Sequence, residues 1–247
     1  EKPFLYIISF DSQAQWATEG KTPVSIEEDF EYLLSTWMSD AWIRRDDRPV
    51  MLIFAYDKEY SFYDNASNGR FDIVWPSYIS DSNHHAAYAW VNPDKIEPDG
   101  LWFDNDSSGS KYLNRFYKSC NDNKNLEYII GGVWPGFNDT LVRWVWNDGI
   151  ENHTARPRII CEETSSGNTL EQTWQEAVNY IKNQVAADGM LPMPIIQIVT
   201  WNDWAETTQV EPDCETGFKK LKICKKFKNN IQSINSKCII KDKEVLV

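Results

Sequence analysis

The sequence predicts an α/β fold in which parallel strands alternate with helices. Six short apolar runs are close to continuous, as expected of strands covered on both faces. Apolar residues at helical spacing lie between several of these runs, and this alternation is typical of parallel strands joined by crossover helices. The predicted strands are residues 4–10, 50–56, 72–75, 87–91, 128–133 and 195–200.

Four helices are predicted from start signals and periodicity. A capping box at Ser25 and Glu28 opens the first helix, and a second box at Thr169 and Gln172 opens the helix that runs to about residue 185. Residues 111–119 form a further helix. The last helix covers residues 215–235, and its apolar side chains recur at helical spacing. These apolar residues are Phe218, Leu221, Cys224, Phe227, Ile231 and Ile234.

The chain reads as one domain spanning residues 1–247. No repeat, low-complexity segment or Pro/Gly/Ser-rich linker divides it, and 247 residues are enough to bury a substantial core. No apolar run approaches eighteen residues, so we expect no membrane span. The formal net charge of −12 argues against a nucleic-acid partner. The sequence leaves the oligomeric state open.

The last helix carries an excess of lysine. Residues 219–247 hold nine Lys against one Asp and one Glu. A basic segment of this kind would suit an anionic surface, but a solvated outer face of the helix is the commoner reason for such a run, and we favour it.

Cysteine and histidine spacing predicts no metal site, because the five Cys and three His form no CxxC pair or ligand cluster. Four glycosylation sequons favour a glycoprotein that is secreted or resides in the lumen of the secretory pathway. The sequons begin at Asn65, Asn105, Asn138 and Asn152.

Aromatic, carboxylate and amide residues follow every predicted strand. In a β/α barrel the carboxyl ends of the strands meet at one mouth, where active sites lie. Aromatic faces stack on sugar rings, and polar side chains bind the hydroxyls, so this mouth predicts an oligo- or polysaccharide ligand. The candidate sugar-binding residues are Asp57, Trp75, Trp90, Trp134, Asp139, Arg143, Trp201, Asn202, Trp204 and Gln209.

Several of these residues have an equally simple structural role. Roughly half of such strand-end Trp residues finish in the core. Asp139 and Arg143 could brace their loop as an ion pair. Asp57 could cap its own loop.

Asp203 and Glu206 are the best candidates for catalysis. Glycoside hydrolysis needs two carboxyl groups beside the scissile bond, one protonated and one ionised. These two acids stand three residues apart after the last strand, and we expect Trp201 and Trp204 to exclude water and raise the pKa of one of them. The alternative is that Glu206 only caps the next helix.

Two segments resemble glycoside hydrolase family 99. The stretch IIQIVTWNDWAETTQVEP is similar to the family's Asn-Glu-Trp-x-Glu-x-Thr-Gln-Ile-Glu pattern, and WPGFNDTLVRWVWN to its Pro-Gly-Tyr-x-Asp-Thr-x-x-Arg segment. The strand RPVMLIFAYD resembles the family's Arg/Lys-Pro-Val strand. Asp203 and Thr207 depart from the pattern, which has Glu and Gly there. The TWND-x-x-E form is instead similar to family 71, the α-1,3-glucanases.

The resemblance implies a (β/α)₈ TIM-type barrel that acts on α-linked sugars, as endo-α-mannosidases do. The opening of this chain resembles the family's third strand, so the first two barrel strands would be missing. Either the chain is part of a longer parent, which we favour, or the protein is a degenerate barrel. By the family's mechanism, Asp203 would assist the sugar's 2-hydroxyl through an epoxide-like intermediate, and Glu206 would protonate the leaving group. Two carboxyls suffice for this chemistry, so no metal or cofactor is implied.

Two other hypotheses remain beside an α-glycosidase. A non-catalytic carbohydrate-binding barrel would keep the aromatic mouth and lack turnover. A structural or interaction protein would use the barrel as a scaffold, and its partner would contact the Lys-rich last helix. The two motifs favour the enzyme, because fold alone does not imply function.

Overall fold

The described part of the chain forms two compact units. The computed structural model describes residues 5–11, 23–54, 60–76, 84–97, 102, 105–123, 125–142, 158–188 and 195–235. Unit 1 comprises residues 1–88 and 125–127, and unit 2 comprises residues 89–124 and 128–247. Whether they act as the single domain expected from the sequence stays a prediction.

Unit 1 is built on four parallel strands in the order β1-β3-β4-β5. Their register places Met51 of β3 between Ile8 of β1 and Ile73 of β4. A short strand, β2, pairs antiparallel with β3. The strands are β1 (Ile8–Asp11), β2 (Arg44–Arg45), β3 (Arg48–Phe54), β4 (Asp72–Pro76) and β5 (Ala86–Tyr88).

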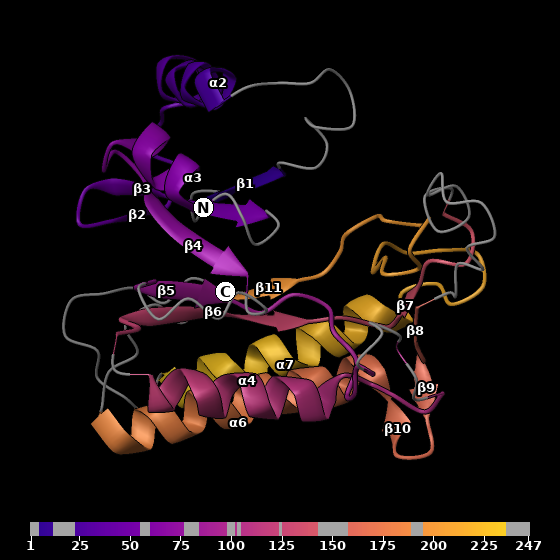
Figure 1. The fold of residues 1–247 in the computed structure, drawn as a ribbon. Coiled ribbons are helices and arrows are strands. Elements are labelled where there is room, and N and C mark those ends of the chain that lie inside the picture. The colour runs from indigo at the N-terminus through magenta and orange to yellow at the C-terminus, as the bar shows by residue number, and fades with distance from the viewer. Residues whose placement is uncertain are drawn as a thin grey trace. The chain divides into compact units, whose positions relative to one another are not determined.

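Two helices cover one face of these strands: α2 (Pro23–Thr36) and α3 (Tyr60–Ser67) (Figure 1). Their aromatic side chains reach into the sheet. Phe30 of α2 packs edge-on against Phe10 of β1, with ring centroids 5.3 Å apart, and Tyr63 of α3 lies 6.0 Å from Trp75 of β4. Edge-to-face pairs of this kind are favoured over flat stacking and give unit 1 its core.

Unit 2 places three helices beside two parallel strands. Strands β6 (Tyr128–Val133) and β11 (Ile195–Ile198) pair with Ile130 next to Ile195. Helix α6 (Thr169–Asp188) contacts both α4 (Ser110–Asp122) and α7 (Lys219–Asn235), as Figure 1 shows.

Stacked rings join these three helices. Tyr117 of α4 stacks on Tyr180 of α6 with ring centroids 4.4 Å apart, and Trp174 of α6 stacks on Phe227 of α7 at 5.9 Å. Each pair buries a large apolar area, so the helical layer is held by aromatic packing.

Two short antiparallel pairs complete unit 2. Strands β7 (Phe137–Asn138) and β8 (Ile159–Ile160) pair with Phe137 opposite Ile160, and β9 (Glu163–Thr164) pairs with β10 (Gly167–Asn168). The first pair lies in the chain between β6 and α6 and brings the segment after Trp134 close to the segment before α6.

The structure contains all six predicted strands and all four predicted helices, with bounds shifted by a few residues. The sequence analysis missed α3 and the two short antiparallel pairs. The parallel strands are consistent with part of a β/α barrel, whereas the count of eight strands and the missing first pair stay predictions.

Both predicted capping boxes are wrong in detail. Helix α2 begins at Pro23, so Ser25 lies inside it, and the fixed φ of proline suits the first helical position. At α6 the cap is Asn168, whose side-chain oxygen accepts the N–H of Glu171 at 3.2 Å. Gln172 instead donates to Thr164 Oγ1 at 2.8 Å.

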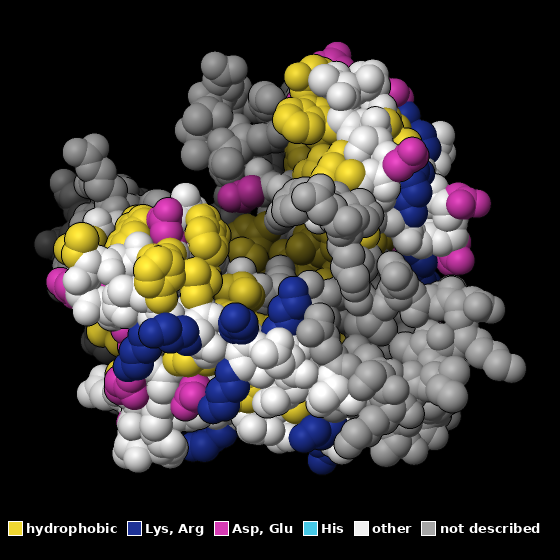
Figure 2. Space-filling model, turned by 180° about the vertical axis from the view of Figure 1, so that it is seen from behind, with side chains coloured by type: hydrophobic (Ala, Val, Ile, Leu, Met, Phe, Trp, Pro, Cys, Tyr) yellow, Lys and Arg dark blue, Asp and Glu magenta, His cyan; other side chains and the backbone are white. Residues whose placement is uncertain are grey.

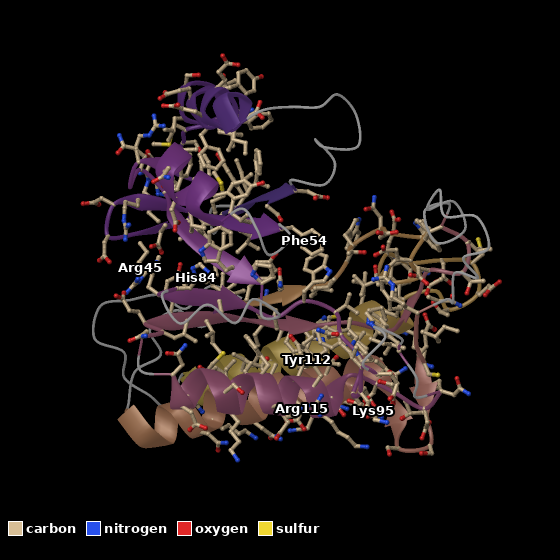
Figure 3. All side chains as sticks on the ribbon, viewed as in Figure 1. Arg45, Phe54, His84, Lys95, Tyr112 and Arg115 are labelled. Carbon is tan, nitrogen blue, oxygen red and sulfur yellow. The ribbon has the colours of Figure 1, made fainter. Side chains whose placement is uncertain are left out.

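Helix α4 is capped by a residue distant in the sequence. Gly109 precedes it in the left-handed conformation, with φ 78°, and supplies no side-chain acceptor. Asp94 takes that role, because its carboxylate accepts the N–H groups of Lys111 at 2.8 Å and Ser108 at 3.2 Å. Arg115, labelled on α4 in Figure 3, donates to the carbonyl oxygen of Asp94 at 2.6 Å.

Most lysines of α7 lie on an exposed face of the helix, where some have acidic neighbours, whereas Lys220 is buried. Lys219 pairs with Glu163 and Lys226 with Glu171, both at 3.1 Å. Figure 2 shows Lys and Arg side chains in dark blue close to acidic ones in magenta. The structure supports the solvated-face interpretation over an anionic partner. Among the described residues, no helix combines the length and apolar character needed to cross a membrane.

Replacing Gly109 with Ala should destabilise unit 2 strongly. A Cβ there would meet the carbonyl oxygen of Asn92 and would lie 2.6 Å from Cζ2 of the Trp134 ring. We expect a loss of about 3 kcal/mol or more in the free energy of unfolding, from backbone strain and overpacking together. Chemical denaturation would measure it.

Gly69→Ala is the matched control. Gly69 has a similar φ of 70°, but a Cβ there meets nothing within 4 Å, so only the backbone strain of about 1–2 kcal/mol applies. Equal losses in the two variants would contradict the packing argument.

Candidate active site

The loop after β11 carries the predicted acids, and two threonines close it. The N–H of Thr200 donates to the carbonyl oxygen of Thr208 at 2.9 Å, and their hydroxyl groups are hydrogen-bonded at 2.8 Å. Thr208 is fully buried. Residues 201–207 therefore form a closed loop whose ends are fixed beside the carboxyl end of β11.

Within this loop the structure brings Asp203 and Glu206 together. The Asp203 carboxylate accepts the backbone N–H of Glu206 at 3.0 Å, and the N–H of Asp203 donates to Thr200 Oγ1 at 3.0 Å. Both acids are partly buried. The loop thus presents two carboxyl groups on one turn, as the sequence predicted.

The pKa of Glu206 is raised to about 7, from an ordinary value of 4.5, and burial is the largest cause. The negative charges of Asp203 and Asp139 contribute to this rise, whereas the positive charge of Arg158 opposes it. A carboxyl group that keeps its proton near neutral pH is suited to act as a general acid.

A second segment is tied to this loop. The N–H of Asn138 in β7 donates to the carbonyl oxygen of Glu206 at 2.8 Å. Asp139 follows and is fully buried, and its carboxylate binds Arg158 through the backbone N–H and Nε, both at 2.6 Å. The two family-99-like motifs are therefore in direct contact in the fold.

Asp139 takes the structural role that the sequence left open, with a different partner. It forms an ion pair with Arg158, and its buried carboxylate has no exposed surface to offer a sugar. Arg143, the expected partner, lies outside the described residues, as does Asp57.

The sequence analysis missed Arg158. In the sequence, Arg158 is distinguished only by its position before the apolar pair Ile159-Ile160. The antiparallel pairing of β7 with β8 aligns Arg158 with Asp139, and this pairing has no clear signal in the sequence.

Three exposed side chains lie on the loop itself. Trp201 is 53% exposed and Trp204 48%, and Asn202 is exposed as well. The indole N–H of Trp204 donates to Glu211 at 3.2 Å, which fixes the ring. Both rings have free surface on which a sugar could stack. The expected rise in the pKa of one acid is found at Glu206, with burial as its largest cause, and the expectation that these two rings exclude water stays a prediction.

The remaining strand-end residues differ in exposure. Trp134 is fully buried in unit 2, and its indole N–H donates to the carbonyl oxygen of Ser108 at 2.9 Å, so it is a core residue. Trp75 is 2% exposed and lies in the core of unit 1, stacked on His84 at 4.8 Å. Trp90 is partly buried.

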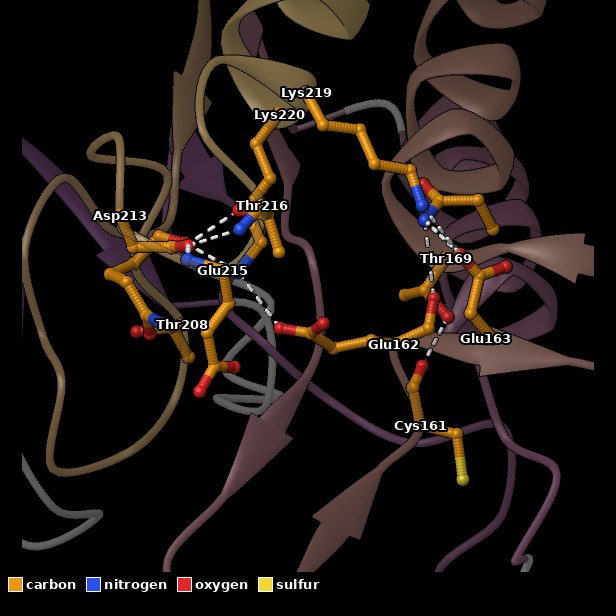
Figure 4. A network of polar contacts seen from close by, with 12 residues as sticks. Cys161, Glu162, Glu163, Thr169, Thr208, Asp213, Glu215, Thr216, Lys219 and Lys220 are labelled. Atoms are coloured by element: carbon orange, nitrogen blue, oxygen red, sulfur yellow. Dashed lines mark hydrogen bonds and ion pairs between the residues drawn. The ribbon is translucent and has the colours of Figure 1, made fainter.

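Gln209 is buried and is held from α7. Lys220 donates to the backbone carbonyl of Gln209 at 3.0 Å and to Glu162 at 2.8 Å, and is itself buried. Figure 4 shows Lys220 and Glu162 together with a neighbouring turn, in which Asp213 accepts the hydroxyl group of Thr216 at 2.7 Å just before α7. The far end of the loop is thus anchored to the last helix.

The described residues contain no group of three or more His, Cys, Asp or Glu side chains that could hold a metal ion. The loop offers two carboxyl groups, one of them with a raised pKa, beside exposed aromatic rings.

Comparison with known proteins identifies the fold. No protein-family model and no curated protein sequence matches the chain. Among solved structures, the GH99 endo-alpha-mannosidase from Bacteroides thetaiotaomicron in complex with BIS-TRIS-propane is similar, with a TM-score of 0.56 and 16% identity over 93% of this chain and 70% of that chain.

A second structure of the GH99 endo-alpha-mannosidase from Bacteroides thetaiotaomicron gives a TM-score of 0.53 and 15% identity, over 92% of this chain and 65% of that chain. The chain therefore shares the fold of these GH99 structures and spans about two thirds of their length.

Proposed function

We propose that this protein is a glycoside hydrolase that cleaves α-linked glycans of the mannan or glucan type. The single observation that carries the proposal is Glu206, whose pKa is raised to about 7 on a loop that also holds Asp203 and two half-exposed Trp rings. The likeness of fold to GH99 endo-alpha-mannosidases supports it.

In this proposal Glu206 is the general acid and base. Its protonated carboxyl donates to the glycosidic oxygen as the bond from that oxygen to the anomeric carbon breaks. The resulting carboxylate then accepts a proton from the water that attacks the anomeric carbon, and Glu206 returns to its acid form.

Asp203 is the second carboxylate. By the route that the family resemblance implies, it accepts the proton of the sugar's 2-hydroxyl while that oxygen attacks the anomeric carbon, and returns the proton when water opens the intermediate. One of its oxygens already accepts the N–H of Glu206, so the other is the oxygen we assign to this proton transfer.

Trp201 and Trp204 supply the stacking surface of the proposed site. Stacking of a sugar on an aromatic face tolerates different linkages and ring substituents. It therefore binds the glycan without discriminating between glycans. We propose an endo-acting enzyme because the solved structures of similar fold are those of endo-alpha-mannosidases.

Glu206→Gln should abolish turnover in a folded protein. The amide cannot donate the proton that the leaving oxygen requires, so we expect product release from α-mannan and α-glucan oligosaccharides to fall by about 10²–10⁴-fold. Chromatography of the products would measure it, after thermal melts show that both proteins unfold cooperatively.

Glu215→Gln is the control for that experiment, because Glu215 is an exposed acid outside the catalytic loop. It should cleave the same oligosaccharides at the wild-type rate. Equal turnover by the wild type and Glu206→Gln would contradict the assignment of Glu206. Absence of cleavage by the folded wild type across the whole panel would contradict the proposed activity.

The free energy of unfolding should depend on pH because of the raised pKa of Glu206. Between its ordinary pKa of 4.5 and its folded value of about 7, the folded state binds more protons than the unfolded state. The free energy of unfolding therefore falls as the pH rises through this window, by about 1–2 kcal/mol once partial exposure is allowed for. Glu206→Gln lacks this titration and should become the more stable protein above pH 7.

Denaturant unfolding at pH 4.5 and pH 8 would test this. The difference in unfolding free energy between the wild type and Glu206→Gln should change between the two pH values, whereas Glu215→Gln should track the wild type. Parallel curves for the wild type and Glu206→Gln would show that Glu206 titrates normally.

A further inference from the structure

The ion pair between Asp139 and Arg158 differs from a surface pair, because its carboxylate is buried and both carboxylate oxygens accept hydrogen bonds. Asp139 is fully buried, and both of its carboxylate oxygens are used: one accepts the backbone N–H of Arg158 and the other accepts Nε, each at 2.6 Å. The carboxylate therefore binds Arg158 at its backbone and at the Nε end of its side chain, and the bond to Nε is charge-assisted.

The outer half of the Arg158 side chain is held by two rings. Its central guanidinium carbon lies 5.3 Å from the centroid of Trp102 and 5.4 Å from that of Phe137. The side chain is 39% exposed. Within the described ranges, its two terminal nitrogens have no hydrogen-bond partner, so an oriented positive charge is left with donors to spare.

The segment that binds Arg158 is also hydrogen-bonded to the backbone of Glu206. Asn138, the residue before Asp139, donates its N–H to the carbonyl oxygen of Glu206 at 2.8 Å. Residues 138, 139, 158 and 206 therefore form one hydrogen-bonded unit. The charge of Arg158 acts on the Glu206 carboxyl and lowers its pKa, against the effects of burial and of Asp203 and Asp139.

A general acid and base must be stable in both of its protonation states. Burial alone would favour the protonated form of Glu206 and leave a weak acid that holds its proton too tightly. A guanidinium group keeps its charge at every pH of interest, so it can stabilise the ionised form without competing for the proton.

We propose that Arg158, oriented by Asp139, is a positioning residue that stabilises Glu206 as a carboxylate after it has given up its proton. The catalytic meaning of this proposal rests on the proposed function, but the effect on the ionisation of Glu206 does not. Asp139 acts through Arg158, and neither residue contacts the reacting atoms in this scheme.

Two single variants separate positioning from a simple charge effect. Arg158→Gln removes the positive charge and should raise the pKa of Glu206 by about one unit. Asp139→Asn removes a negative charge, which by itself would lower that pKa. Because the variant also releases Arg158, we expect the pKa of Glu206 to rise instead. NMR titration of ¹³C-labelled Glu carboxyls, with Glu206→Gln to assign the signal, would measure both.

The controls address folding and charge. Arg158→Gln leaves Asp139 buried without its partner, so the double variant Asp139→Asn/Arg158→Gln supplies a neutral pair if the single variant fails to fold. The double variant should show a rise smaller than that of Arg158→Gln, because the negative charge of Asp139, which raises the pKa of Glu206, is lost as well. Arg158→Lys keeps the charge and should show a smaller rise. Arg48→Gln breaks a comparable pair with buried Asp72, 3.1 Å apart, and Arg48 is not among the charges that act on Glu206, so its titration should be unchanged.

The outcomes decide the proposal. An unchanged titration of Glu206 in Arg158→Gln and in the double variant would overturn it, and a lowered pKa in Asp139→Asn would overturn the positioning role of Asp139. If the wild type cleaves the oligosaccharides, the alkaline limb of its kcat profile should move up in pH by the same amount in Arg158→Gln. If the wild type cleaves none while the NMR shifts appear as expected, the proposed function fails and the positioning of Glu206 stands.

Discussion

The pairing of Thr200 with Thr208 is the interaction on which the candidate site depends. It joins the end of β11 to the residue that precedes buried Gln209, through one backbone hydrogen bond and one hydroxyl contact. Since Thr208 is fully buried, water does not compete for these groups. Backbone N–H groups of Val210 and Glu211 support this closure by donating to the carbonyl oxygen of Trp201 at 3.0 and 2.9 Å, and the closed loop holds the carbonyl oxygen of Glu206 where it accepts the N–H of Asn138.

Charge balance explains why the acids lie where they do. The carboxylates of Asp203 and Asp139 act on Glu206, which is partly buried, and charges in such a region are tolerated only if some of them are neutralised. Arg158 neutralises Asp139 directly, and Asp203 receives a backbone N–H. Glu206 keeps its proton to a higher pH than an ordinary glutamate, because burial and the nearby negative charges raise its pKa.

The sequence predicted the parts of this site that lie close together along the chain. Asp203, Glu206 and both Trp residues share seven positions after a continuous apolar strand, so one local pattern reports them all. The fold could be predicted in the same way, because strands such as 128–133 have a clear apolar run. Arg158 could not be found, since it meets Asp139 only through the β7–β8 pairing, nineteen residues away. The burial of Trp134 depends on Gly109 and Ser108, which the sequence gives no reason to place against it.

The hydrogen bond from the Glu206 N–H to the Asp203 carboxylate has a consequence for how this site can diverge. The side chain of Asp203 accepts the backbone N–H of Glu206 and, in the proposed function, also takes part in proton transfer. Its length therefore has to fit the geometry of the turn. A lineage that exchanged it for glutamate would move the carboxylate outward by one methylene and would have to find another acceptor for that amide. The identity of the acid and the shape of the turn are therefore inherited as one unit, and a substitution in either would be selected together with a compensating change in the other.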